Sequence, residues 1–158
     1  MKALGLNLLI AVIWLLLSPD PSPAVFAIGF LIGFGLVAAF RSLVGGRAYV
    51  RRCFAFLAFL WIFTREFLVA NAKVAWMALF RPRESIHPNF LTYDVTGMTP
   101  TEILLLSYCI TLTPGTTSVD ISADFKTLIL HAIEADDPGA IRAGIDGSLK
   151  RGILSFTR

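Results

Sequence analysis

Carboxylates are almost absent from the first 65 residues of the sequence, and this limits the folds that the chain can adopt. Asp20 is the one acidic residue before Glu66. It lies in a Pro-rich break between two apolar runs, Ala3–Leu17 and Ala24–Phe40. The stretch Phe90–Arg158 instead mixes apolar, polar and charged residues in the manner of a water-soluble domain. The sequence therefore predicts two environments, with lipid around the front of the chain and water around its rear.

The two apolar runs are predicted to form a transmembrane helical hairpin over residues 1–40. At about 1.5 Å per residue the first run covers roughly 20 Å, so it needs its flanking residues or a locally thin bilayer to span. A cleaved signal peptide is the competing interpretation, because Lys2 precedes an apolar run of suitable length. In the second run, the spacing of Gly29 and Gly33 favours close approach of another helix and marks both as candidates for contact with a neighbouring subunit, although glycine is also simply common in membrane helices.

The third apolar stretch, Cys53–Phe80, is long enough to span a bilayer but carries charge in its middle. Arg65, Glu66 and Lys73 fall on one narrow stripe of a helix at 100° per residue. An Arg or Lys at the centre of a spanning helix costs about 2.5 to 3.5 kcal/mol. The stripe is a candidate for contact with lipid or subunits, for plain solvation or for a part in ion movement, and these alternatives stay open.

Arginines flank the third stretch on both sides and are absent from the turn before the second run. They are Arg41, Arg47, Arg51, Arg52, Arg81 and Arg83. Cytoplasmic flanks of membrane helices are enriched in positive charge. We therefore expect residues 41–83 to form a basic connection and an interfacial or partly embedded helix on the cytoplasmic side, with a third full span as the alternative.

Residues 84–158 are predicted to form a cytoplasmic α+β domain in the order strand, helix, strand, strand, helix, with both helices on one face of the sheet. Alternation of apolar residues predicts the strands, and a capping box of Thr99 and Glu102 opens the first helix. The expected elements are a strand at Phe90–Val95, a helix from Pro100 to about Leu112, a hairpin of strands at Thr117–Ile121 and Lys126–Ile133, and a helix that begins near Pro138.

No motif in the sequence indicates catalysis, a cofactor or a metal site. His87 and His131 each lack a second ligand at metal-binding spacing, and Cys53 and Cys109 are interpreted as small apolar residues. Phosphate-binding glycine loops and nucleophile motifs are also absent from the sequence. The net charge of +3 comes mainly from arginines beside apolar helices, so it indicates membrane topology and not nucleic-acid binding.

The segment Ser107–Ile121, which reads S-Y-C-I-T-L-T-P-G-T-T-S-V-D-I, carries a family resemblance. It resembles the S-I-T-L-T-P-G-T turn, followed by a strand with V-D, that is typical of the E subunits of the Mrp-type multisubunit sodium/proton antiporters, also called the Mnh or Pha type. Leu128–Ile133 is similar to the next strand of that family, and His131 matches a family position. Tyr108-Cys109 replaces the small polar pair expected there. The apolar helices agree in order and length, so the resemblance covers essentially the whole chain.

The resemblance implies an accessory subunit of an inner-membrane complex that exchanges monovalent cations for protons. Larger subunits carry the ion and proton paths in that family, so this chain would mainly support assembly, without a cofactor, beside other subunits and the bilayer. Its family turn would be a structural corner, made of Thr111, Leu112, Thr113, Pro114, Gly115 and Thr116, with Asp120 in the following strand. The alternative is a free-standing membrane-anchored module whose cytoplasmic domain recruits a soluble partner.

Overall fold

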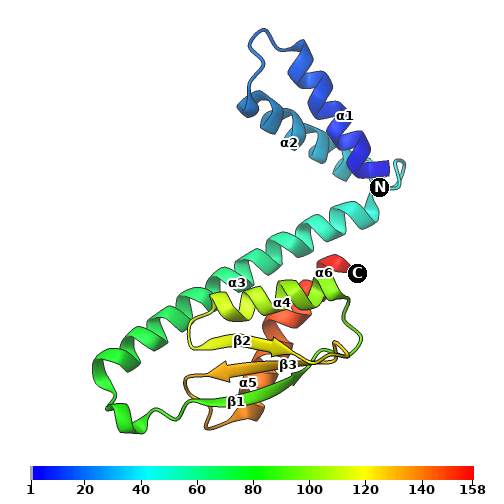
Figure 1. Cartoon of the computed structure of the whole chain (residues 1–158). Helices are drawn as coiled ribbons and strands as arrows, with labels where there is room; N and C mark the ends of the chain where they lie inside the picture. The colour runs from blue at the N-terminus through cyan, green and yellow to red at the C-terminus, as the bar shows by residue number, and fades with distance from the viewer. Residues whose placement is uncertain (1) are drawn as a thin grey trace. The chain divides into compact units, whose positions relative to one another are not determined.

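The computed structural model describes residues 2–158, and the chain forms two compact units, Met1–Phe54 and Ala55–Arg158. The first unit holds α1 (Lys2–Leu17), α2 (Pro23–Ala39) and the start of α3 (Arg47–Phe80). The second unit holds the rest of α3 and then, in chain order, the 3₁₀ turn η1 (Arg83–Ser85), β1 (Asn89–Asp94), α4 (Pro100–Leu112), β2 (Thr116–Ile121), β3 (Thr127–Ala132), α5 (Pro138–Ile145), the π-helical turn η2 (Asp146–Lys150) and α6 (Arg151–Thr157). Figure 1 shows these elements along the chain.

The helices α1 and α2 form an antiparallel hairpin around the predicted break. Ser22 caps α2 by accepting the Val25 N–H at 3.3 Å, and Pro23 occupies the first helical position. The helices have 16 and 17 residues, so each is roughly 25 Å long. Within residues 2–158, α3 is the helix that is long and apolar enough to cross a membrane by length and composition, whereas α1, α2 and α4 are apolar but shorter.

Close packing of α1 on α2 depends on Gly29 and Gly33. A Cβ at Gly29 would lie 2.8 Å from Trp14 Cβ, and one at Gly33 would lie 3.2 Å from Ile10 Cβ and against the side-chain oxygen of Asn7. Both glycines are buried. Their close helix contact is therefore made within the chain's own hairpin, as the expected helix packing requires, and contact with a neighbouring subunit stays a prediction. Because the short turn after α1 folds the chain back on itself, α1 is the helix that packs against these two glycines.

Asn7 is a fully buried polar residue in this hairpin. Its amide nitrogen donates a hydrogen bond to the Tyr49 hydroxyl at 2.8 Å, which links α1 to the first turn of α3. Its amide oxygen faces Gly33 and has no hydrogen-bond partner among the described residues. Because a hydrogen bond away from water has little competition from solvent, this link helps to fix the hairpin on the following helix.

The helix α3 begins at Arg47, earlier than the predicted start at Cys53. Gly45, at φ +65, ends the connection, and the Gly46 carbonyl accepts the Val50 N–H at 3.0 Å. The residues after Gly46 include good helix formers and no breaker, so the helix starts as soon as the chain leaves the glycine pair. Half of the predicted basic connection is thus helical.

The sheet has the order β1-β3-β2 with antiparallel pairs, and β3 lies between the other two strands in Figure 1. Leu91 of β1 lies opposite Leu130 of β3, and both are buried. Tyr93 and Leu128 form the next buried pair on the same face. These residues share one core with α4 and with the last helical segment. The observed order of strands and helices agrees with the predicted one, and both helical segments cover the same face of the sheet.

The last helix is interrupted, whereas the sequence predicted one continuous helix. It runs as α5, the π-helical turn η2 and α6. Ile145, Leu149 and Ile153 recur every four residues and are all buried. On an ideal α-helix of 3.6 residues per turn, such a row drifts by about 40° at each step. The wider π turn removes this drift and keeps the row on the core.

Glu102 is a buried carboxylate, 4% exposed, that ties the start of α4 to the end of α6. It completes the predicted capping box, since the Thr99 N–H donates to its side chain at 2.7 Å. The Thr157 hydroxyl donates to it at 2.7 Å and the Arg158 guanidinium at 3.2 Å. The Arg158 hydrogen bond, followed by those of Thr157 and Thr99, lowers the pKa of Glu102 to about 2.

We expect Gly33→Ala to destabilise the hairpin, because the new methyl group would overlap the Asn7 side chain. Overpacking of this kind costs about 1–3 kcal/mol. The matched control is Gly35→Ala, which meets nothing within 4 Å on the same helix. Thermal unfolding of the detergent-purified full chain measures both. Equal melting midpoints for the two variants would show that the contact at Gly33 does not limit stability.

We expect Glu102→Gln to destabilise the chain in a pH-dependent way. Because the folded pKa of about 2 lies below the ordinary value of 4.5, the ionised carboxylate stabilises the fold fully above about pH 4.5, and this contribution is lost as the pH falls towards 2. The variant should lose about 1–3 kcal/mol at pH 7. Thermal unfolding followed by circular dichroism at pH 7 and pH 3 should show a smaller difference from wild type at the lower pH. The exposed residue Glu84, changed to Gln, serves as control, and a pH-independent difference would contradict the prediction.

Candidate membrane and subunit interface

From Ala55 onward, α3 has one face on the α+β domain and one face that no residue of the second unit covers. Phe59 and Met77 are buried, and Phe59 belongs to the domain core beside Phe156 of α6, with ring centroids 5.3 Å apart. The outer face of α3 consists of large apolar side chains that are each more than half exposed: Leu57, Trp61, Leu68, Val69, Trp76 and Leu79. Large apolar side chains exposed together on one helix face mark a candidate site for membrane or protein contact.

The helix α4 adds a second uncovered apolar strip. Its inner side chains, Leu106 and Ile110, are fully buried under the sheet. Leu104, Tyr108 and Leu112 recur every four residues on the other side and are 53%, 59% and 59% exposed. The sequence predicted a helix that is apolar on most faces, and the domain covers only one of them.

Lys73 of α3 is held by the α+β domain and does not project freely from the helix. Its ammonium nitrogen lies 2.5 Å from a carboxylate oxygen of Glu134, which follows β3, and Arg81 pairs with the second oxygen. The Lys73 hydrogen bond and then that of Arg81 lower the pKa of Glu134. We call these three residues the α3 clamp, because they fasten the second half of α3 to the sheet.

Arg65 and Glu66 pair with each other and not with Lys73. The Arg65 guanidinium lies 3.2 Å from the Glu66 carboxylate, and 68% of the Arg65 side chain is exposed. The three predicted charges thus form two separate ion pairs along the helix, Arg65 with Glu66 and Lys73 with Glu134. A helical-wheel argument treats the helix as isolated, whereas here a carboxylate from a distant part of the sequence attracts Lys73. No local signal in the sequence points to Glu134 as that partner.

The predicted family turn is a hydrogen-bonded corner between α4 and β2. The Thr113 hydroxyl donates to the Cys109 carbonyl at 2.8 Å, and the Thr116 hydroxyl donates to the Ile110 carbonyl at 3.2 Å. These bonds satisfy the last carbonyls of the helix. Gly115 has a φ of +98, which side chains with a Cβ rarely adopt. Threonine and glycine are therefore needed here for local geometry.

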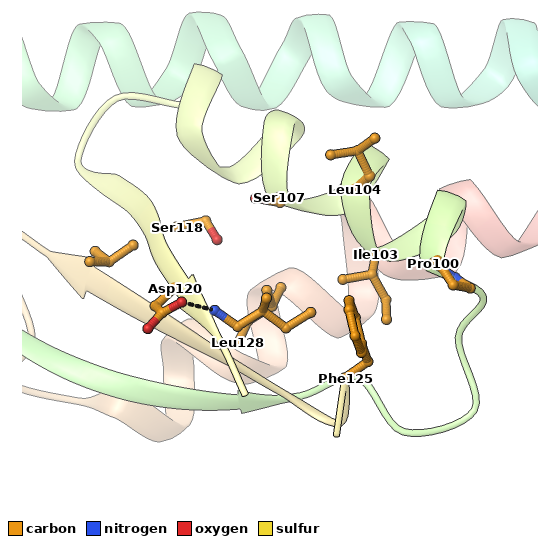
Figure 2. Close-up of a pocket in the computed structure, with 10 residues that line it drawn as sticks. Pro100, Ile103, Leu104, Ser107, Ser118, Asp120, Phe125 and Leu128 are labelled. Carbon is orange, nitrogen blue, oxygen red and sulfur yellow. Dashed lines mark hydrogen bonds between the residues drawn. The ribbon is translucent and has the colours of Figure 1, made fainter. Parts of the chain in front are cut away.

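A groove of about 450 Å³ lies between α4 and β2. Figure 2 shows Ile103 of α4 next to Phe125 of the β2–β3 turn, with Leu128 of β3 beside them, so this end of the groove is apolar. Ser107 and Ser118 line its other end. The groove has the shape and polarity to receive an apolar side chain, and it holds no arrangement that would perform chemistry.

The edge of β2 beside this groove is irregular. The register shifts between Ser118 and Asp120, which is a β-bulge. The Thr111 hydroxyl accepts the Ser118 N–H at 3.2 Å, and the Asp120 carboxylate accepts the N–H of Ile121 at 2.8 Å. These bonds use backbone donors that would otherwise be offered to another strand, so this edge is protected against strand addition.

The histidines and cysteines singled out in the sequence do not form a reactive site among the described residues. His131 packs edge-on against Phe90, with ring centroids 5.0 Å apart, and His87 lies 3.1 Å from the Asp136 carboxylate. Cys53 and Cys109 are free thiols. Across residues 2–158, no three His, Cys, Asp or Glu side chains gather to hold a metal ion.

Comparison with known proteins gives consistent matches over nearly the full chain. Residues 7–155 match a family described as Na+/H+ ion antiporter subunit. The chain is 32% identical over 153 residues to the Na(+)/H(+) antiporter E subunit of Alkalihalophilus pseudofirmus, covering 97% of this chain and 96% of the relative. It is 34% identical over 146 residues to the Na(+)/H(+) antiporter E1 subunit of Staphylococcus haemolyticus, covering 92% and 91%.

Two solved structures are also similar. One chain comes from the Mrp complex of Dietzia sp. DQ12-45-1b, with 28% identity, a TM-score of 0.50 and coverage of 63% of this chain and 91% of that one. The other comes from the membrane-bound sulfane sulfur reductase, an archaeal respiratory membrane complex, with 25% identity, a TM-score of 0.51 and coverage of 86% and 85%. Both matched chains are parts of membrane complexes.

Proposed function

The chain belongs to the family of Na+/H+ ion antiporter subunits whose relatives are named as E subunits, and we propose that it is an accessory subunit of a multisubunit antiporter. Its complex would exchange a monovalent cation, Na+ or K+, for protons across the cell membrane. Its partners would be the other antiporter subunits and the bilayer. The alignments cover nearly the whole of this chain and nearly the whole of each relative, which supports the same role for this chain.

We propose that the subunit supports assembly and stability of the complex and that other subunits carry the ions. The observation that carries this proposal is the outer face of α3, where large apolar side chains are exposed on the second unit. The ionisable residues of α3 from Ala55 onward are engaged within the chain, because Lys73 belongs to the α3 clamp and Arg65 pairs with Glu66. Groups held in this way stabilise the fold of the subunit.

The proposed topology places α1 and α2 across the membrane, with the Pro-rich turn outside and the Arg-rich connection inside. The concentration of arginines after α2 supports this orientation. The second half of α3 would lie at the inner interface, since Phe59 and Met77 are buried on its inner face while Trp61 and Trp76 point outward. Tryptophan is enriched at the membrane surface. The α+β domain would then be cytoplasmic.

A topology reporter fused after Arg158 tests this arrangement. We expect green fluorescent protein at that site to fluoresce and alkaline phosphatase to be inactive, because both report a cytoplasmic position. Phosphatase fused after Ser22, in the turn between α1 and α2, is the matched control and should be active. Active phosphatase after Arg158 would instead support three full spans, with α3 crossing the bilayer.

Replacement of clamp residues separates assembly from ion movement. Lys73→Gln and Glu134→Gln should lower the amount of intact complex while the exchange rate per assembled complex stays unchanged. The effect of Lys73→Gln should be modest, about 1 kcal/mol or less, because its side chain is 66% exposed. Glu134→Gln should be more severe, since it loses both cations. Pull-down of a tagged subunit gives the amount of complex, and dye-reported antiport in everted vesicles gives the rate.

The exposed residue Arg83, changed to Gln, controls for simple loss of a positive charge. Fully assembled complexes that no longer exchange ions in the Lys73→Gln variant would place this residue in the ion path and overturn the proposal. If the wild-type chain purifies alone in mild detergent, the free-standing anchored module becomes the better interpretation.

A further inference from the structure

A basic cavity lies where α3 begins, within the first unit of the chain. It has a volume of about 340 Å³ and is lined by Arg41, Arg47, Val50, Arg51 and Phe54. Arg41 follows the end of α2, and the other four lie on one face of α3 at helical spacing. Val50 is 3% exposed and Phe54 packs edge-on against Phe34 of α2, with ring centroids 6.0 Å apart, so the cavity has a fixed apolar wall.

The local field in this cavity favours an anion. The sequence supplies one carboxylate to this unit, Asp20, and it lies at the other end of the hairpin, roughly 25 Å away along α2. The first turn of α3 contains no acidic residue, and its helical hydrogen bonds begin with the Val50 N–H. The earlier N–H groups and the helix dipole therefore add positive potential at the same place as the guanidinium groups.

The surroundings of the cavity point to an anion that carries hydrocarbon. Phe54 is 58% exposed beside the arginines. On the same connection, a second cavity of about 350 Å³ has an entirely apolar lining that includes Leu36, Phe40 and Leu43. Arginine binds phosphate oxygens in pairs through its planar fork. Basic pockets beside membrane helices on the cytoplasmic side recognise anionic lipid headgroups.

We propose that Arg41 and Arg47 form a binding site for the phosphate of an anionic membrane phospholipid, with its acyl chains against the apolar surface of the hairpin. The site rests on the proposed insertion of α1 and α2 in the membrane. It lies at the proposed inner surface of the hairpin and goes beyond the assembly role of the subunit. Its occupant would hold the end of α2 and the start of α3 at a fixed depth in the inner leaflet.

Thermal unfolding of the full chain in detergent, titrated with phosphatidylglycerol, tests the site. We expect a saturable rise of the melting midpoint that phosphatidylcholine does not produce. Each of the variants Arg41→Gln and Arg47→Gln should need about fivefold more phosphatidylglycerol for half of the effect. Arg83→Gln, which removes an equal charge in the second unit, should leave the titration unchanged. Arg41 lies outside the helices, so its variant keeps the test valid if a change within α3 perturbs folding.

Three results would overturn the proposal: no saturable effect of phosphatidylglycerol on the wild type, an equal loss in Arg83→Gln, or an equal rise with inorganic phosphate at matched ionic strength. The last would identify a soluble phosphate as the ligand. Extraction of membranes with alkaline carbonate is measured in parallel. Release of the wild-type chain by carbonate would refute membrane insertion itself, whereas a retained chain that ignores phosphatidylglycerol would refute only the lipid site.

Discussion

The divided surface of α3 is the constraint on which the rest of the structure depends. Phe59 belongs to the core of the α+β domain, so α3 cannot leave that domain without exposing its core. On the opposite side, Trp61 is 73% exposed and Leu68 is 60% exposed. Exposure of such apolar side chains to water is unfavourable in free energy. A helix with these two faces is stable only where a water-soluble domain meets lipid or another apolar protein surface. The α3 clamp fixes the rotation of the helix about its axis, so that one face stays on the domain core and the apolar outer face stays exposed.

Parts of the fold were predictable because their causes are local. The capping box of Thr99 and Glu102 depends on residues three apart, and it is present as predicted. The corner around Gly115 needs a positive φ, and the alternation along β3 needs only one buried face. Each of these signals lies within a few residues of the structure that it specifies, so the order of elements in the second unit could be predicted from the sequence.

The candidate interface was less predictable, because its deciding contacts join distant parts of the sequence. Lys73 was assigned to a polar stripe, yet Glu134 pairs with it from the end of β3. Asn7 was a detectable signal, since it is the amide in an otherwise apolar run, but its partner Tyr49 lies 42 residues further along the chain, beyond α2. The π turn near Leu149 was also missed, although the strict four-residue spacing of the apolar row indicates it in retrospect.

The placement of charge in the second unit also bears on the division of work within an antiporter. A group that relays protons near neutral pH needs a pKa close to that pH. Two carboxylates of this unit have pKa values shifted away from neutral pH: Arg158 and its neighbours hold the pKa of Glu102 at about 2, and Lys73 with Arg81 lowers the pKa of Glu134. Both therefore stay ionised throughout the physiological range. The partners of Glu134 lie on and just after α3, and those of Glu102 lie at the end of α6 and the start of α4, so these interactions stabilise the shape of the domain.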